Sequence, residues 1–505
     1  RQGLATGDNN KFLRLWSEVS IENVKLNSNS REESLNSDFK WFPYNKGGEF
    51  RKWYGNNDYI VNWENDGAEI KNFKDENGQL RSRPQNTSNY FSESITWSKI
   101  SSGSIAFRYK PYGHIFDVAG TSIFGESDIL TYLLGLNNSK IILEILKAIS
   151  PTLNFEVGQI SQIPVKINND NTKVKSIVNS NISISKTDWD SFEESWDFEK
   201  HPLIKFKNSN SIQESFKSWE SFTLKQFNQL KENEEELNRI FIDIYGLQDE
   251  LTPEVEDKDV TIRKADKERD IKSLISYAVG CMFGRYSLDQ DGLVYAGGDF
   301  DHSKYKIFKA DKDNVIPIND NNYFMDDIVV KFKEFIKVAF GEEKLHENLE
   351  YIADVLGKRN TETSEDTIRR YFIKDFYKDH LKIYKKRPIY WLFDSGKANG
   401  FKCLIYMHRY EENLAAKIRI DYLHKIQRVF EKELDEVKYK LTGELSPNER
   451  KDAMNLQKDL SNKLTEIKEY NENLDHIANQ KINIDLDDGV KVNYAKFESV
   501  LAKIK

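Results

Sequence analysis

Hydrophobic residues recur at helical spacing near the end of the chain. Five of them repeat at seven-residue intervals, in two interleaved series: Leu423, Phe430 and Val437, and Leu434 and Leu441. The series resumes after a polar turn with Ala453, Leu456, Leu460, Leu464, Ile467, Leu474 and Ile477. Gly443 is placed to end the first helix and Pro447 to begin the second. The pattern predicts an antiparallel helical hairpin with coiled-coil character over 425–480, its second arm roughly 50 Å long at 1.5 Å per residue.

The first third of the chain has a different pattern. Short runs typical of strands occur at 59–63, 104–109 and 114–120, and apolar residues at helical spacing predict one helix over 128–149. The segment TLNFEVGQISQIPV (152–165) alternates and ends near Pro164, which predicts a closing strand. We therefore expect a mixed α/β domain over residues 1–168.

The middle of the chain is mainly helical. Polar clusters between 168 and 185 predict a connector, and residues 228–247 place Leu, Ile and Phe side chains on one helical face that ends at Gly246. A strand-like segment, RPIYWLF (387–393), lies among further helices. The expected fold class is α+β. The expected organisation is a mixed domain at 1–168, a helical connector at 169–275, a mainly helical domain at 276–424, the hairpin at 425–480 and a tail at 481–505.

Composition narrows the class of protein. The 505 residues are 38% hydrophobic and 31% charged, and no apolar run approaches the roughly 20 residues that span a bilayer. With only Cys281 and Cys403, a disulfide framework is excluded and a cysteine zinc site is disfavoured, so we expect a cytoplasmic protein and no membrane partner. The chain begins without Met and has no signal-peptide core, and we expect a fragment of a longer chain.

The net charge of −8 means that any contact with DNA must come from local basic patches. One such stretch is KWFPYNKGGEFRKWYGNNDYIVNW (40–63), which interleaves aromatic rings with cations around Gly47 and Gly48. Rings can stack on bases, cations can pair with phosphates, and glycines let backbone N–H groups approach a phosphate. The competing interpretation is a core of aromatic rings with solvated cations around it.

A second basic segment is KNFKDENGQLRSRPQN (71–86). Arg81 and Arg83 suit bidentate reading of guanine, and Asn86 or Gln85 suits adenine.

Other chemistry is weakly indicated. Asp326 and Asp327, followed by GEEK (341–344), loosely match the acidic-x-Lys arrangement of metal-dependent nucleases, but these charges also suit a solvated helix face. Three scattered histidines, His380, His408 and His424, lack the spacing of a metal site. The sequence has no Walker A, G-x-S-x-G or H-E-x-x-H motif, and GCMFGR (280–285) lacks the Lys-Ser/Thr of a phosphate loop.

Several long segments resemble one family, the BREX phage-defence adenine-specific DNA methyltransferases of PglX type. The segments are GLATGDNNKFLRLW (3–16), 40–67, RSRPQN (81–86), FDVAGTSIF (116–124), 152–165, 188–198, 234–255, 276–298, 387–410 and 486–497. The resemblance covers nearly the whole chain. It departs from the family's catalytic part, because a Gly-rich S-adenosylmethionine loop and an Asn/Asp-Pro-Pro-Tyr tetrad are both missing from this sequence.

The resemblance implies the target-recognition and C-terminal half of such an enzyme. It implies no catalytic, cofactor-binding or metal residues in this chain, with S-adenosylmethionine bound by the full-length parent. The implied partners are double-stranded DNA, the parent's N-terminal methyltransferase domain and other BREX proteins. The implied DNA-binding residues are Lys40, Tyr44, Lys46, Gly47, Gly48, Arg51, Lys52, Arg81, Arg83 and Asn86, and Thr6 and Asn9 are expected to border the catalytic domain.

Two alternatives remain open. The hairpin and the acidic net charge suit a protein-docking scaffold of the defence complex. The chain is also compatible with the specificity half of a fused restriction–modification enzyme, which would require a nuclease site.

Overall fold

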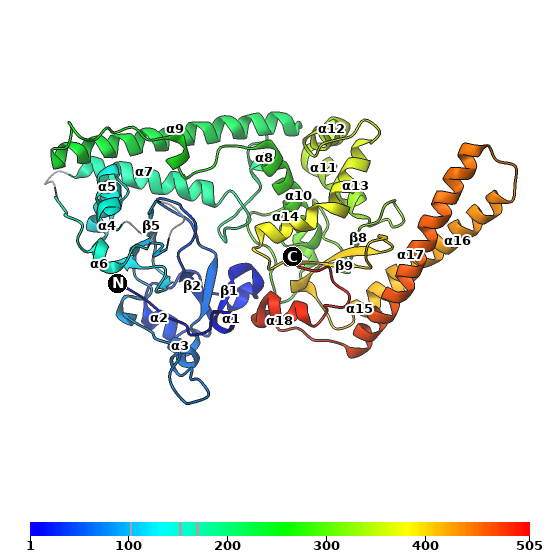
Figure 1. Ribbon diagram of the computed structural model, residues 1–505, viewed down its shortest axis with the longest axis horizontal. Helices are drawn as coiled ribbons and strands as arrows, with labels where there is room; N and C mark the ends of the chain where they lie inside the picture. The colour runs from blue at the N-terminus through cyan, green and yellow to red at the C-terminus, as the bar shows by residue number, and fades with distance from the viewer. Residues whose placement is uncertain (101–103, 151–153, 168–170, 505) are drawn as a thin grey trace. The chain divides into compact units, whose positions relative to one another are not determined.

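The computed structural model describes residues 1–100, 104–150, 154–167 and 171–504. Contacts divide the chain into two compact units (Figure 1). Unit 1 contains Arg1–Trp16, Ile21–Glu199 and Lys217–Ala265, and unit 2 contains Ser17–Ser20, Lys200–Phe216 and Asp266–Lys505. The expected α+β class is confirmed, with small sheets and many helices.

Unit 1 is built on two small sheets. The first has the strand order β1(Leu13–Leu15)-β3(Tyr59–Asn62)-β2(Trp41–Asn45)-β6(Ile115–Phe116), in which only the β2–β6 pair is parallel. The second is antiparallel, in the order β5(Phe107–Lys110)-β4(Ser94–Trp97)-β7(Ser122–Ile123). Every residue of β2 is buried, because both of its faces are covered. The rings of the aromatic stretch are therefore drawn into the core of this unit.

The helices of unit 1 divide between two hydrophobic clusters. Phe12 of α1(Asn9–Phe12) and Ile70 of α3(Glu64–Lys71) belong to a cluster with the first sheet, and α2(Arg31–Leu35) lies against α3. The second cluster includes residues of α4(Ser127–Asn137), α5(Lys140–Ile149), α6(Val157–Ile160), α7(Thr172–Trp189) and most of α9(Ile212–Tyr245). α7 and α9 lie side by side, joined by a hydrogen bond from the Asn233 amide to Ser180 Oγ (3.2 Å) and by Lys173 with Glu236 (Figure 1). Leu134, Val178 and Phe241 are among the residues of the shared core.

The helix predicted over 128–149 is broken into α4 and α5, which are bent by 72°. The break lies at Ser139, whose backbone is extended (φ −75°, ψ 155°). The residue before it is anchored to β5, because the Asn138 side chain accepts a hydrogen bond from the Phe107 N–H (3.0 Å) and donates one to the Phe107 carbonyl (2.9 Å). Among the described residues, no single helix is long and apolar enough to cross a membrane, and the α4–α5 pair passes such a test only as a bent pair.

One sequence prediction in this unit is wrong. The closing strand expected over 152–165 is replaced by the short helix α6, whose start is fixed by a capping box between Glu156 and Gln159; residues 152 and 153 lie outside the described residues. Within the helical connector expected at 169–275, the polar stretch up to 185 belongs mostly to α7, because Val174, Val178 and Ile184 recur on one buried face among polar neighbours.

Unit 2 surrounds a three-stranded antiparallel sheet of order β8(Ile316–Pro317)-β10(Lys402–Tyr406)-β9(Tyr390–Asp394). The strand predicted at 387–393 is thus β9. The helices around the sheet are α8(Pro202–Lys205), α10(Lys267–Phe283), α11(Ile328–Phe340), α12(Leu345–Val355), α13(Ser364–Lys374), α14(Phe376–Ile383), α15(Leu414–Lys417) and α18(Gly489–Ala495).

The predicted helical hairpin is present in unit 2. It consists of α16(His424–Leu441) and α17(Pro447–Gln480), which run alongside each other (Figure 1). Pro447 opens α17 next to a Ser446–Glu449 capping box. The apolar residues Phe430, Leu460 and Ile467 are buried between the hairpin and its surroundings, whereas Leu456 is 46% exposed.

Candidate nucleic-acid interface

Six of the eight rings of the stretch 40–63 lie in the core, and only Phe50 and Tyr59 are half-buried. Trp41, Tyr44, Trp53 and Trp63 are each at most 1% exposed. The Tyr44 hydroxyl lies 3.0 Å from the Leu4 carbonyl and 2.8 Å from Asp117 Oδ2, where it donates. The assignment of Tyr44 to DNA is therefore corrected, because a buried and hydrogen-bonded phenol presents no surface to a base.

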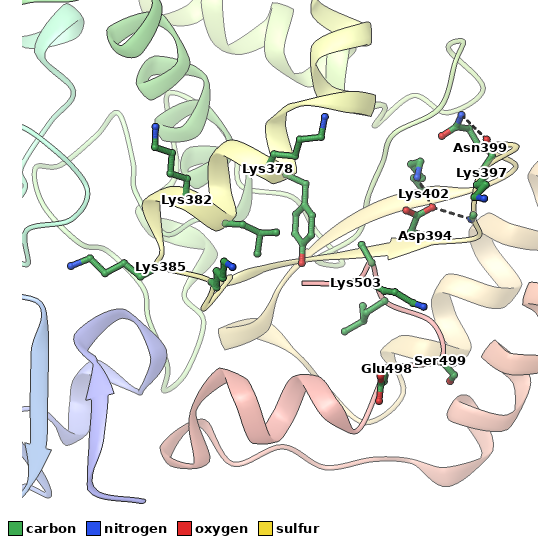
Figure 2. Close-up of a pocket in the computed structure, with 16 residues that line it drawn as sticks. Lys378, Lys382, Lys385, Asp394, Lys397, Asn399, Lys402, Glu498, Ser499 and Lys503 are labelled. Carbon is green, nitrogen blue, oxygen red and sulfur yellow. Dashed lines mark hydrogen bonds and ion pairs between the residues drawn. The ribbon is translucent and has the colours of Figure 1, made fainter. Parts of the chain in front are cut away.

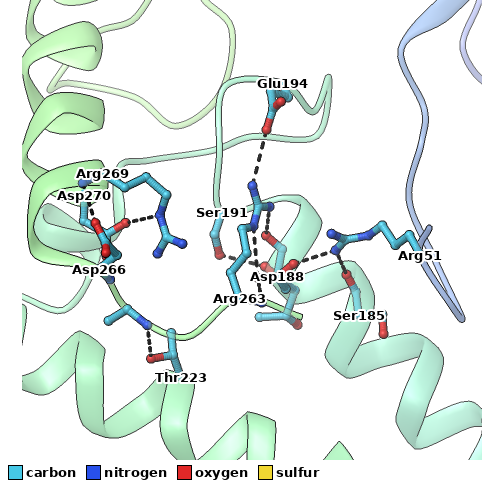
Figure 3. A network of polar contacts seen from close by, with 12 residues as sticks. Arg51, Ser185, Asp188, Ser191, Glu194, Thr223, Arg263, Asp266, Arg269 and Asp270 are labelled. Atoms are coloured by element: carbon cyan, nitrogen blue, oxygen red, sulfur yellow. Dashed lines mark hydrogen bonds and ion pairs between the residues drawn. The ribbon is translucent and has the colours of Figure 1, made fainter. Parts of the chain in front are cut away.

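Arg51 is held in a buried ion-pair network (Figure 3). Its Nη2 lies 2.5 Å from Asp188 Oδ2 and its Nε donates to the Tyr54 carbonyl (2.8 Å). Asp188 also accepts from Arg263 Nε at 3.3 Å. Burial alone would raise the pKa of Asp188, but the guanidinium groups of Arg263 and Arg51 outweigh it and lower that pKa below its usual value. The prediction that Arg51 contacts DNA is wrong, because its guanidinium is buried and paired with Asp188.

The prediction that Lys52 contacts DNA is wrong for the same reason. Its side chain is 5% exposed, and its Nζ lies 2.6 Å from Oε2 of Glu234, whose side chain is 4% exposed. The other oxygen of Glu234 accepts from Trp53 Nε1 at 2.7 Å. Lys52 thus joins α9 to the first third of the chain, and its partner lies too far along the sequence to be inferred from it.

Gly47 and Gly48 are required by packing within unit 1. Both have positive φ, 83° and 146°, which favours glycine. The Gly48 N–H donates to Ser98 Oγ (3.0 Å), and a Cβ on Gly48 would lie 2.6 Å from Asn56 Nδ2. The predicted phosphate cradle at Gly48 is therefore corrected, because its N–H is already bonded.

Two cations of the stretch keep partial exposure. Lys40 is half-buried, with its Nζ 5.5 Å from the centre of the Trp41 ring. Lys46 is half-buried with its Nζ 3.9 Å from Asp117 Oδ2, and burial lowers its pKa. Contact of Lys40 and Lys46 with DNA stays a prediction.

The second basic segment is more accessible. Residues 72–86, here called the Arg81 loop, leave α3 and turn at 75–80, where the Asp75 side chain accepts from the backbone N–H groups of Asn77 and Gln79 (each 2.9 Å) (Figure 1). Arg81 and Arg83 are both exposed. Arg81 lies over the Phe73 ring, 5.2 Å from its centre, and donates to the Gly7 carbonyl (3.2 Å). Within the described part of the chain, the Arg83 guanidinium has no hydrogen-bond or ion-pair partner.

The structure brings the Arg81 loop beside the N-terminal segment. Ala5 and Arg83 exchange both backbone hydrogen bonds (3.1 and 2.8 Å), and the Asn86 side chain donates to the Gln2 carbonyl (2.8 Å). Thr6 Oγ1 donates to Asn9 Oδ1 at 2.6 Å in the same segment. Two groups that the sequence predicted separately, Thr6 with Asn9 and the arginines with Asn86, therefore lie on adjacent segments. The side-chain amide of Asn86 already donates to Gln2, so Arg83 is the most accessible of the side chains predicted to read bases.

The loose nuclease pattern is not assembled. The carboxylate of Asp327 is bound by Arg369 (2.8 and 2.9 Å) and caps α11, while Glu342 pairs with Lys337 at 2.8 Å. Asp326 instead clusters with Asp311 and Asp313. Burial and the nearby Asp313 raise the pKa of Asp311 to about 6. Tyr422 donates into this cluster, lying 2.8 Å from Asp326.

A group of lysines in unit 2 was not predicted from the sequence. Lys378, Lys382, Lys385 and Lys386 lie on or just after α14. Their spacing of four, seven and eight residues from Lys378 is typical of one helical face, and this signal was available in the sequence.

Comparison with known proteins gives two relatives along nearly the whole chain. The adenine-specific methyltransferase PglX of Lacticaseibacillus casei (strain Zhang) is 46% identical over 508 residues, which cover 99% of this chain and 42% of that protein. The adenine-specific methyltransferase BrxX of Escherichia coli O9:H4 (strain HS) is 39% identical over 535 residues, which cover 100% of this chain and 43% of that protein. The chain spans less than half the length of these curated relatives. No protein-family model matches it.

Proposed function

We propose that this chain is the DNA-recognition and C-terminal region of a BREX-type adenine-specific DNA methyltransferase, and that it binds duplex DNA. The similarity to two proteins named adenine-specific methyltransferases, at 46% and 39% identity, carries the proposal. In the full enzyme an adenine is flipped from the duplex and its amino group is methylated by S-adenosylmethionine, which marks host DNA as self. Flipping requires a closed pocket that reads the base edge, and we assign that pocket to sequence outside this chain.

The Arg81 loop supports the DNA-reading part of the proposal. Arg83 is exposed on a turn whose backbone is fixed by pairing with Ala5, so its guanidinium can extend without loss of loop order. A planar guanidinium with two parallel donors matches the O6 and N7 acceptors of guanine in the major groove. We therefore assign base reading to Arg83, with Arg81 as the second reader.

Selection from a random duplex pool tests this assignment. The protein is compared with R83A, with R81A/R83A and with the control K258A, which removes a lysine that is 73% exposed elsewhere in unit 1. One lost bidentate contact costs about 1–3 kcal/mol, so R83A is expected to lose preference at one position of the selected site by roughly 5- to 150-fold. K258A should select the same site. An unchanged site from R81A/R83A would refute the assignment.

The proposal also states that methyl transfer needs the parent's N-terminal domain. Labelled S-adenosylmethionine and duplex DNA are expected to give no methylated DNA with this chain alone and methylated adenine with the full-length parent. Methyl incorporation by the 505-residue chain would contradict this part.

A second candidate function is protein docking by the hairpin, as a scaffold of the defence complex. The observation that favours it is exposed apolar surface on α16 and α17: Tyr439 is 82% exposed, Met454 57% and Leu456 46%. Such side chains are often recruited to interfaces. If Y439S/M454S/L456S leaves DNA binding unchanged but abolishes co-purification of another BREX protein, the hairpin is a docking arm; if co-purification persists, this function is refuted.

A further inference from the structure

Unit 2 contains a wide groove of about 1190 Å³ whose walls are rich in lysine (Figure 2). Three parts of the chain form it: α14 with the turn that follows, the β9–β10 connection, and residues 498–503. Seven of the lining residues are lysines, at 378, 382, 385, 386, 397, 402 and 503, against the carboxylates of Asp394 and Glu498. In a chain of net charge −8 this is a local reversal of sign.

Internal ion pairs neutralise only a part of this charge. Lys402 pairs with Asp394, and Lys378 pairs with Asp375 at 3.0 Å. Lys382, Lys386, Lys397 and Lys503 are exposed, and none of them has an ion-pair partner among the described residues. Four ammonium groups are thus left to solvent or to an external anion. Exposed lysines are usually interspersed with acidic residues, so an unpaired group of this kind indicates an anionic partner.

The turn after α14 holds lysine in an unfavourable backbone conformation. Lys385 and Lys386 have φ of 48° and 59°, in the left-handed region that glycine or asparagine enters at lower cost. Such residues cost on the order of 1–3 kcal/mol each and cluster at functional sites. The turn itself is well bonded, since the Lys386 N–H donates to the Leu381 carbonyl at 2.7 Å. The turn needs left-handed residues, and the side chains placed there extend the basic face of α14.

The ammonium groups do not converge on one point. Lys378 and Lys382 leave α14 toward the same side, while Lys385 and Lys503 point in other directions (Figure 2). A single phosphate or nucleotide requires donors aimed at one place, whereas a polyanion with regularly spaced charges is matched by cations spread along a groove. Tyr377 is the one aromatic residue of the lining and is 9% exposed, so it offers little ring surface for base stacking.

We propose that this groove binds the phosphate backbone of double-stranded DNA without reading sequence. The inference rests on the proposed function, which it deepens by naming a phosphate-binding surface in unit 2. Lysine supplies mobile point charges suited to phosphate, whereas bidentate base reading is a property of arginine. The groove therefore contributes affinity and salt dependence, and the Arg81 loop contributes site preference.

The test is a variant in which Lys382, Lys386, Lys397 and Lys503 are all replaced by Gln, in the full chain. A charge-matched control replaces Lys337, Lys344, Lys432 and Lys438 by Gln; these lie in the same unit and are at least 44% exposed, but each is paired with a glutamate or aspartate. Fluorescence anisotropy with a labelled duplex of random sequence is measured between 50 and 200 mM salt. Each phosphate contact contributes about 0.9 to the slope of log affinity against log salt.

Loss of four contacts should lower that slope by about 3.6, so the ratio of wild-type to variant affinity shrinks by about 150-fold between 50 and 200 mM salt. The control should keep the wild-type slope. Replacement of the same four lysines by Arg should restore binding, which shows that charge and not folding was lost.

The outcomes separate this inference from the proposed function. If the wild-type chain does not bind duplex at any salt, the proposed function fails. If it binds with a site preference that depends on Arg83, but the Gln variant behaves like the control, the groove inference alone is overturned and an acidic protein surface becomes the better occupant. A slope change seen with single-stranded DNA but not with duplex also overturns it.

Discussion

The ion pair between Lys52 and Glu234 allows a direct distinction between a structural and a DNA-binding lysine. Both side chains are about 5% exposed or less, and the Nζ–Oε2 distance is 2.6 Å. Replacing Lys52 by Met removes one of the two groups that donate to the Glu234 carboxylate. The carboxylate stays buried and keeps only the hydrogen bond from Trp53 Nε1. Breaking a buried pair in this way costs about 3–5 kcal/mol, because an uncompensated charge stays inside.

A second substitution recovers part of this loss. In K52M/E234Q the charge is gone and the glutamine oxygen still accepts from Trp53, so the remaining penalty is an unpaired carboxamide nitrogen, about 1–3 kcal/mol. The double variant is thus expected to be about 2 kcal/mol more stable than K52M. Urea unfolding followed by tryptophan fluorescence measures both, and Trp53 itself reports on this region. K258A, which breaks an exposed pair, should change the free energy of unfolding by less than about 1 kcal/mol.

Duplex affinity of K52M/E234Q completes the test. Because Lys52 is enclosed, the folded double variant should bind duplex DNA as the wild-type chain does. If K52M costs less than about 1 kcal/mol, the same as an exposed pair, the buried pair is not as described. If K52M/E234Q is stable but loses DNA affinity, Lys52 contacts DNA and the correction made above is wrong.

Three further predictions concern stability. The pKa of Asp188 is lowered in the folded protein. The ionised carboxylate therefore stabilises the fold above the unfolded pKa of about 3.9, and this stabilisation is lost as the pH falls through the folded pKa. The difference in free energy of unfolding between wild type and D188N, measured with urea, should narrow below about pH 4. G48A should destabilise more than G78A, because both positions have positive φ but only Gly48 has atoms within 3 Å of an added Cβ; equal shifts in thermal melting would contradict this. L460A should cost about 2–5 kcal/mol and L456A less than about 1, since they are 1% and 46% exposed, and equal urea midpoints would show that the hairpin packs differently.

Local patterns in the sequence predicted the elements that depend on local spacing. The hairpin was found because its apolar residues repeat at helical intervals and because Pro447 marks a helix start. The break after Asn138 was missed, since the contacts of this residue are with Phe107 in another element. The helix α7 was missed because its buried face is sparse among Asn, Ser and Thr side chains.

The candidate site shows the same division. Arg81 and Arg83 were identified by residue type and are exposed, whereas Arg51 and Lys52, of the same types, are buried. What decides the difference is a carboxylate far along the chain, Asp188 for one and Glu234 for the other. A single sequence does not pair such distant charges. The lysines of α14 were recognisable from their spacing, but the groove that they line requires the β9–β10 connection and the C-terminal segment to come together.

We propose that this chain binds a double helix through local cationic surfaces despite its acidic net charge. The most direct measurement is the equilibrium affinity of the unmodified chain for duplex DNA as a function of salt concentration. We expect binding that weakens steeply between 50 and 200 mM salt, because counterions are released at each phosphate contact. Absence of binding at every salt concentration, or an affinity that does not change with salt, would contradict it.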